Sequence, residues 1–181
     1  MTAPAKPSTR FHTLLHDEIG HFFDASYQDT AIAVYFDNAD LPHLARHFYS
    51  EAKEKRRHAL MVIRYFVDRN IVVELPAVDA AVGGFTDAHA PIALALEQEK
   101  RLTEQIVELA RTARDEGDFL GEQFVQWFLQ EQVEEVATMH TLVRISRRAG
   151  DDLFQLDNFV ERELAVAPET KGAPPLPGGM A

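Results

Sequence analysis

The sequence predicts an all-α protein, a four-helix bundle with a long crossover between the second and third helices and a short fifth helix. Apolar or small residues recur at a three-then-four spacing in four long segments, which places them on one face of a helix. Glycine and proline are scarce inside these segments. One connection, at about residues 70–86, is much longer than the others.

The four long helices are predicted in chain order from this spacing. The second should begin at Asp40-Leu41-Pro42, with Asp40 as its cap and the proline in its first turn. The predicted helices cover about 8–36, 40–68, 87–115 and 119–148.

The connections predict how the helices are arranged. Short links join the first helix to the second and the third to the fourth, so each pair should be antiparallel neighbours. The segment 70–86 can cross the whole bundle, which gives the long-crossover topology. Residues 151–164 are expected to form the fifth helix. One domain is therefore expected over 1–166, followed by a Pro/Gly-rich flexible tail at 167–181.

Composition narrows the classes of function. The chain has 181 residues, a formal net charge of -11 and no cysteine. The acidic balance argues against nucleic acid as a main partner and suits attraction of cations, although solubility explains it equally well. Without cysteine there is no disulfide and no thiolate metal site. No signal peptide and no membrane span are expected, so a cytoplasmic protein without a membrane partner is predicted.

Charged and amide side chains interrupt the apolar stripes of three predicted helices at mid-length. Burying a carboxylate is costly unless it is paired or binds a metal ion. Three such interruptions at one level favour a single shared polar site over scattered accidents, and oxygen and imidazole ligands suit iron, manganese or zinc. The residues are Glu51, Lys55, His58, Glu99, Gln132 and Glu135.

Four segments carry a resemblance to a known family. They are Ala31-Ile-Ala-Val-Tyr-Phe-Asp37, His47-Phe-Tyr-Ser50, Asp115-Glu-Gly-Asp-Phe-Leu-Gly-Glu-Gln-Phe124 and Gln126-Trp-Phe-Leu-Gln-Glu-Gln-Val-Glu-Glu135. Together they resemble actinobacterial non-haem ferritins over about Thr9 to Val166. The resemblance implies a ferritin-like di-iron domain and a homo-oligomeric, 24-subunit shell that stores iron as ferric mineral.

The resemblance also implies which residues would bind iron. The family's ligands match at His58, Glu99 and Gln132. Phe22 stands where the family has a glutamate, Lys55 replaces the bridging glutamate, and Asp29 replaces a tyrosine. A set matching an accessory iron site of some bacterial ferritins comprises Glu54, Glu131, Glu134 and Glu135.

These replacements imply a degraded ferroxidase centre. Two unit charges 4 Å apart repel by roughly 4 kcal/mol at an effective dielectric of 20, so an ammonium at the bridging position disfavours a metal ion. Lys55 is expected to pair with Glu99, and with Asp29 or Glu135 as further partners. An aromatic residue and a lysine at these positions resemble the light-chain subunit of animal ferritins, which stores iron but oxidises it poorly.

Two further features have alternative interpretations. The acidic turn formed by Asp115, Glu116, Asp118 and Glu122 matches the residues that line ferritin three-fold pores, but it would also serve as ordinary helix capping. The basic surface formed by Lys53, Lys55, Arg56 and Arg57 either contacts phosphate or is a solvated helical face.

Haem is not expected. Arg56 occupies the position of the haem-ligating methionine of bacterioferritins, and Met61 and Met139 fall on the core stripes.

Three functions remain open at this stage. The first is an iron-storage subunit with impaired oxidation, alone or with a catalytic ferritin subunit in a mixed shell. The second is an active ferroxidase with altered ligands, and the third is a scaffold subunit that stores little iron.

Overall fold

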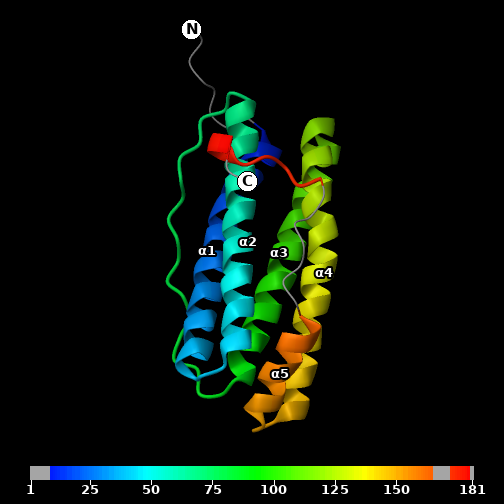
Figure 1. The fold of residues 1–181 in the computed structure, drawn as a ribbon. Helices are drawn as coiled ribbons and strands as arrows, with labels where there is room; N and C mark the ends of the chain where they lie inside the picture. The colour runs from blue at the N-terminus through cyan, green and yellow to red at the C-terminus, as the bar shows by residue number, and fades with distance from the viewer. Residues whose placement is uncertain (1–8, 165–171, 180–181) are drawn as a thin grey trace.

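A computed structural model describes residues 9–164 and 172–179, and it confirms the predicted all-α fold. Four long helices lie side by side, and a short helix lies at one end of the bundle (Figure 1). The elements are α1 (Arg10–Asn38), α2 (Pro42–Asp68), α3 (His89–Asp115), α4 (Phe119–Ala149), α5 (Leu153–Glu163) and a 3₁₀ turn η1 (Pro177–Gly179).

The long crossover runs along α1 from one end of the bundle to the other (Figure 1). Three side chains of α1 hold it, at intervals of eight and four residues. His16 Nε2 lies 2.7 Å from Glu74 O, Asp24 Oδ1 accepts from Asp79 N, and Gln28 bonds both backbone groups of Val82. These contacts fix the path of a segment that has no regular structure of its own.

The start of α2 differs from the prediction. Asp40 does not cap the helix: it adopts a positive φ of 55°, and Leu41 is the N-cap without a side-chain hydrogen bond. Backbone N–H groups in the first turn of α2, which have no acceptor within the helix, instead donate hydrogen bonds to a side chain of α5. Asp157 Oδ1 accepts from His43 N at 3.1 Å and from Leu44 N at 2.9 Å. A carboxylate 113 residues away in sequence therefore replaces the local cap and docks α5 on the bundle.

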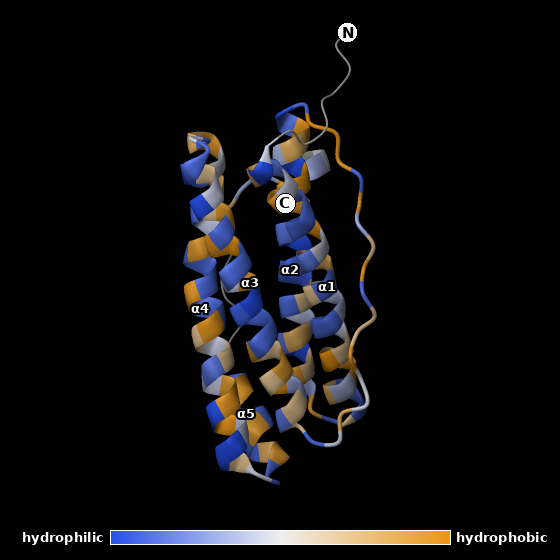
Figure 2. Cartoon of the chain, turned by 180° about the vertical axis from the view of Figure 1, so that it is seen from behind, coloured by the Kyte–Doolittle hydropathy of each residue, from blue (hydrophilic) through white to orange (hydrophobic). Residues whose placement is uncertain are grey.

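Hydrophilic and hydrophobic residues alternate around each long helix, as amphipathic helices require (Figure 2).

Two apolar clusters fill the bundle, and a polar layer separates them. The cluster nearer the start of α1 includes Phe11, Leu15, Ile19, Phe22, Met61, Phe66, Leu102, Ile106, Val125 and Phe128. The cluster nearer α5 includes Ile32, Phe36, Leu44, Phe48, Ile92, Ala95, Met139, Leu142, Leu156 and Val160. Met61 and Met139 are thus core residues, as predicted.

Part of the predicted C-terminal tail contacts the bundle. Ala173 and Leu176 are partly buried against the cluster that contains Phe11. The expectation of flexibility stays a prediction for 167–171 and 180–181, which lie outside the described residues. Within the described part of the chain, no helix is long and apolar enough to cross a membrane.

Gly121 permits the close approach of α4 to the start of α1. A Cβ at this position would lie 2.7 Å from Cζ of Phe11, whose ring is fully buried. We predict that Gly121→Ala lowers the free energy of unfolding by about 1–3 kcal/mol through overpacking. Gly83→Ala is the matched control, because nothing lies within 4 Å of a Cβ there. Equal melting temperatures for the two variants would contradict this account.

Candidate metal centre

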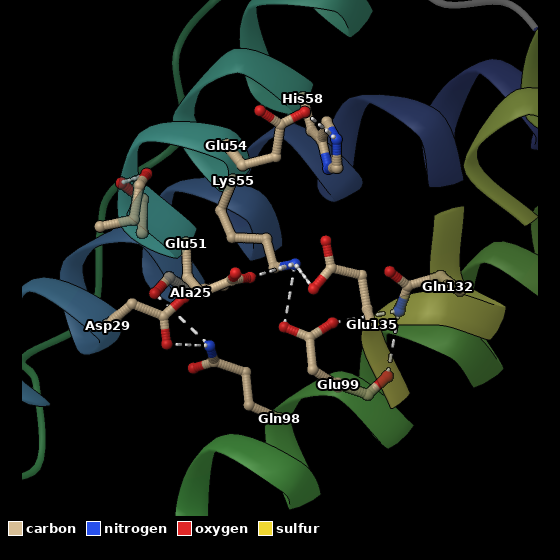
Figure 3. Close-up of polar contacts among 12 residues, drawn as sticks. Ala25, Asp29, Glu51, Glu54, Lys55, His58, Gln98, Glu99, Gln132 and Glu135 are labelled. Carbon is tan, nitrogen blue, oxygen red and sulfur yellow. Dashed lines mark hydrogen bonds and ion pairs between the residues drawn. The ribbon is translucent and has the colours of Figure 1, made fainter. Parts of the chain in front are cut away.

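Lys55 lies at the middle of the polar layer and is fully buried. Its Nζ atom lies 3.0 Å from Glu99 Oε1, 3.5 Å from Glu135 Oε2 and 3.9 Å from Glu51 Oε2 (Figure 3). The three carboxylates come from α2, α3 and α4. The ammonium therefore occupies the point where these helices bring their carboxylates together, and it supplies a positive charge there.

Mutual electrostatic effects determine how this cluster is charged. Burial alone would lower the pKa of Lys55, but Glu135, Glu99 and Glu51 outweigh burial and raise it well above its usual value. Burial raises the pKa of Glu135, yet the neighbouring ammonium dominates and leaves that pKa below its usual value. Burial and the nearby Glu135 raise the pKa of Glu51 well above its usual value. The lysine is thus held in its charged form, while Glu51 favours its protonated form.

Asp29 does not pair with Lys55. The sequence left Asp29 or Glu135 as the further partner of Lys55, and the structure has Glu135 in that role. Its Oδ1 atom accepts a 3.0 Å hydrogen bond from Gln98 Nε2. Burial raises the pKa of Asp29 well above its usual value, although the charge of Lys55 acts in the opposite direction. The expected pairings with Glu99 and Glu135 are both present.

An amide holds Glu99 in place. Gln132 Nε2 lies 3.1 Å from Glu99 O, 3.3 Å from Glu99 Oε2 and 3.1 Å from Thr103 Oγ1 (Figure 3). The carboxylate thus receives the ammonium on one oxygen and an amide N–H on the other. Gln132 therefore acts as a donor here, through its Nε2 atom.

His58 lies in an aromatic pocket apart from the lysine. Its ring meets Phe22, Trp127 and Phe128 edge-on at centroid distances of 5.3 Å each. Its Nε2 atom lies 3.2 Å from Glu54 Oε1. Burial raises the pKa of Glu54, but the close approach of His58 and the neighbouring cations bring it below its usual value. The predicted ligands are therefore divided between a His58–Glu54 pair and the Lys55 cluster.

The remaining predicted ligands lie on α4 with different exposures. Glu134 is exposed and Glu131 is half-buried, whereas Glu135 contacts Lys55. Across 9–164 and 172–179, no three His, Asp or Glu side chains are placed so that they could together hold a metal ion. The donor set near Lys55 fits a built-in ammonium better than a pair of metal ions, because the positive charge is already supplied.

Sequence reasoning missed Glu51 as a partner of Lys55. The signal was present, since Glu51 is four residues before Lys55 on the same helical stripe. It also missed Gln98, because nothing in the sequence shows that this side chain reaches Asp29 across the bundle.

Comparison with known proteins decides the family. Residues 12–149 match the ferritin-like domain family. The chain belongs to the ferritin family.

Relatives of this ferritin chain extend over nearly its whole length. It is 54% identical over 179 residues to ferritin BfrB of Mycobacterium tuberculosis, a match that covers 99% of both chains. Bacterial non-heme ferritin of Staphylococcus aureus is 33% identical over 152 residues, which cover 84% of this chain and 91% of that protein. The open pore ferritin of Archaeoglobus fulgidus superposes with a TM-score of 0.81 at 28% identity, covering 86% of this chain and 96% of that one.

The acidic turn of this ferritin chain forms helix caps and ion pairs. The Glu116 carboxylate accepts from Arg10 N and Phe11 N at the start of α1. Asp118 caps α4 through Gly121 N. The remaining two residues differ: Glu122 pairs with Arg114 at 2.6 Å, whereas Asp115 is exposed. The capping interpretation therefore holds for Glu116 and Asp118, and pore lining stays a prediction for all four residues.

Lys55→Met tests the balance of charge in the polar layer. Removing one partner of a buried ion pair leaves uncompensated carboxylates, so we expect a loss of about 3–5 kcal/mol in the free energy of unfolding at neutral pH. The deficit should shrink as pH falls, because the pKa of Glu135 is held below its usual value by Lys55 and the stability gained from that ion pair is lost as Glu135 is protonated. Chemical unfolding at matched subunit concentration measures both effects.

The exposed Lys53 supplies the control for this experiment. Lys53→Met should change stability by no more than about 0.5 kcal/mol. Adding Glu99→Gln and Glu135→Gln to Lys55→Met should restore part of the loss. A Lys55→Met protein as stable as the unaltered one would show that the cluster does not depend on the ammonium.

Proposed function

We propose that this ferritin chain is an iron-storage subunit of a homo-oligomeric, 24-subunit shell and that it oxidises ferrous iron poorly. The observation that carries the proposal is the position of Lys55 Nζ, 3.0 Å from Glu99 and 3.5 Å from Glu135. Ferrous iron, the substrate of such a centre, would need the carboxylate oxygens that the ammonium engages.

Electrostatic repulsion from the Lys55 ammonium strongly opposes the binding of a ferrous ion beside it. A divalent ion about 4 Å from the ammonium would be repelled by roughly twice the 4 kcal/mol that two unit charges experience at an effective dielectric of 20. The ammonium is fully buried and surrounded by carboxylates, so leaving the cluster would separate it from every close ion-pair partner. Phe22 also supplies a stacked ring against Phe128 where an oxygen ligand would be needed.

Iron binding outside the Lys55 cluster is part of the same proposal. His58 with Glu54 is the pair best placed to hold a single ion, and Glu131 and Glu134 lie on the neighbouring helix α4. The net charge of -11 and the carboxylates of the acidic turn support attraction of ferrous ions to the shell. Gln132, Glu99 and Glu135 stay ligand candidates once the lysine is replaced.

Stopped-flow oxidation of ferrous iron by the homogeneous shell tests the proposal. We expect slow oxidation without a fast phase that saturates at about two irons per subunit, the stoichiometry of a di-iron site. A fast, saturating phase would overturn the proposal and favour a ferroxidase with altered ligands. Mineral should still accumulate over longer times; failure to retain iron would favour a scaffold role.

Restoring the family's side chains at positions 22, 29 and 55 tests whether their replacement is the cause of slow iron oxidation. The triple variant Phe22→Glu, Lys55→Glu and Asp29→Tyr should oxidise ferrous iron at least about tenfold faster, because removal of one obstructing charge is worth several kcal/mol. Lys53→Glu adds the same charge on an exposed position of the same helix and should leave the fast phase absent. If the triple variant assembles and stays slow, Lys55 is not what limits oxidation.

A further inference from the structure

His12 is a buried ionisable side chain that lies outside the polar layer. It is 7% exposed, and its ring packs against the rings of Phe11 and Phe66 at centroid distances of 5.6 and 5.9 Å. Among the described residues, neither ring nitrogen of His12 has a hydrogen-bond partner. An apolar site of this kind tolerates a neutral imidazole far better than a charged one, because water no longer solvates the charge.

Three helix ends meet at this ring. The start of α1, the end of α2 and the start of α4 lie at the same end of the bundle (Figure 1). Asp118, the N-cap of α4, accepts from Gly121 N through Oδ1 and places Oδ2 3.6 Å from His12 Nε2. Arg69, which follows the last residue of α2, has Nη1 3.8 Å from Asp118 Oδ1. Glu116 accepts from two backbone N–H groups at the start of α1.

The surroundings of His12 act on its charge in opposite directions. Burial has the largest effect and lowers the pKa of His12. Asp118 and Glu116 raise this pKa and Arg69 lowers it, and the result lies below the usual value. Tyr65, whose hydroxyl accepts from Arg69 at 3.1 Å, stays neutral because burial raises its pKa to about 12. Asp118 therefore compensates a proton on His12 only in part, and 3.6 Å is too long for a hydrogen bond.

We propose that His12 is an acid-sensitive switch: when its ring takes up a proton, the contacts among the starts of α1 and α4 and the end of α2 open while the rest of the bundle stays folded. The charged ring is repelled by Arg69 and is poorly accommodated between Phe11 and Phe66, so it moves into water. Opening at helix ends costs less free energy than global unfolding, which confines the change to this end. The switch does not involve the Lys55 cluster or the oxidation rate proposed above.

The direction of the pH dependence follows from these contacts. In the open form His12 has the ordinary histidine pKa of about 6.5, whereas the closed form binds the proton more weakly. Stability from the neutral ring is therefore fully present above about pH 6.5 and is lost as the pH falls below it. The equilibrium constant for opening rises by up to about tenfold for each pH unit, until the closed form is protonated as well.

Hydrogen exchange of the assembled shell at about pH 7 and about pH 5 tests the switch. After correction for intrinsic exchange rates, we expect amides in the first turns of α1 and α4 to lose at least about threefold of their protection at the lower pH. Amides around Lys55 should keep theirs. An unchanged pattern, or an equal loss along all four long helices, would overturn the proposal.

His12→Gln separates the ring from the neighbouring carboxylates. Glutamine carries no charge at either pH, so the loss of protection in acid should disappear. His140→Gln, which replaces an exposed histidine on α4, is the matched control and should behave like the unaltered protein. His16 and His47 are the same in both variants, so their contributions cancel. A loss in His12→Gln as large as in the unaltered protein would overturn the switch.

Arg69→Gln tests the electrostatic cause without changing the ring itself. Removing the cation that opposes a proton on His12 should make the loss of protection in acid smaller. A merely structural role of Arg69 would lower protection equally at both pH values. An acid-induced loss that is unchanged or larger in Arg69→Gln would overturn the proposal.

Discussion

The buried ammonium of Lys55 is the interaction on which the middle of this bundle depends. Carboxyl groups from all four long helices surround it: Asp29 from α1, Glu51 from α2, Glu99 from α3 and Glu135 from α4. Removing that many polar groups from water is costly unless charges are balanced and hydrogen bonds are made. The lysine offsets part of this negative charge from inside the layer that separates the two apolar clusters.

The same balance connects structure with function. A carboxylate site that binds two metal ions needs those ions to offset its negative charge, whereas this layer is offset by a covalently attached ammonium. Asp29 and Glu51, whose pKa values are raised well above usual, favour their neutral forms and reduce the negative charge further. Under the proposed function, this balance lowers the attraction of the layer for ferrous iron.

Contacts at the periphery set the level at which the four helices meet. The crossover is fixed to α1 through His16, Asp24 and Gln28, and α5 is fixed to the start of α2 through Asp157. Because the helices are long, a shift of one turn in any of them would move its polar residue away from Lys55 and into an apolar cluster. Fold and site are therefore coupled through register.

Sequence alone determined the helices and their order, because apolar periodicity and the lengths of the connections are local properties. It also identified the layer at Lys55, Glu99 and Glu135, since charge on a core stripe is visible without coordinates. Only the tertiary structure decided that Asp29 bonds Gln98, that Asp157 replaces Asp40 as the cap of α2, and that His12 lies beside Asp118. Each of these contacts joins groups from different helices, and the rotamers and register involved depend on packing that no single segment encodes.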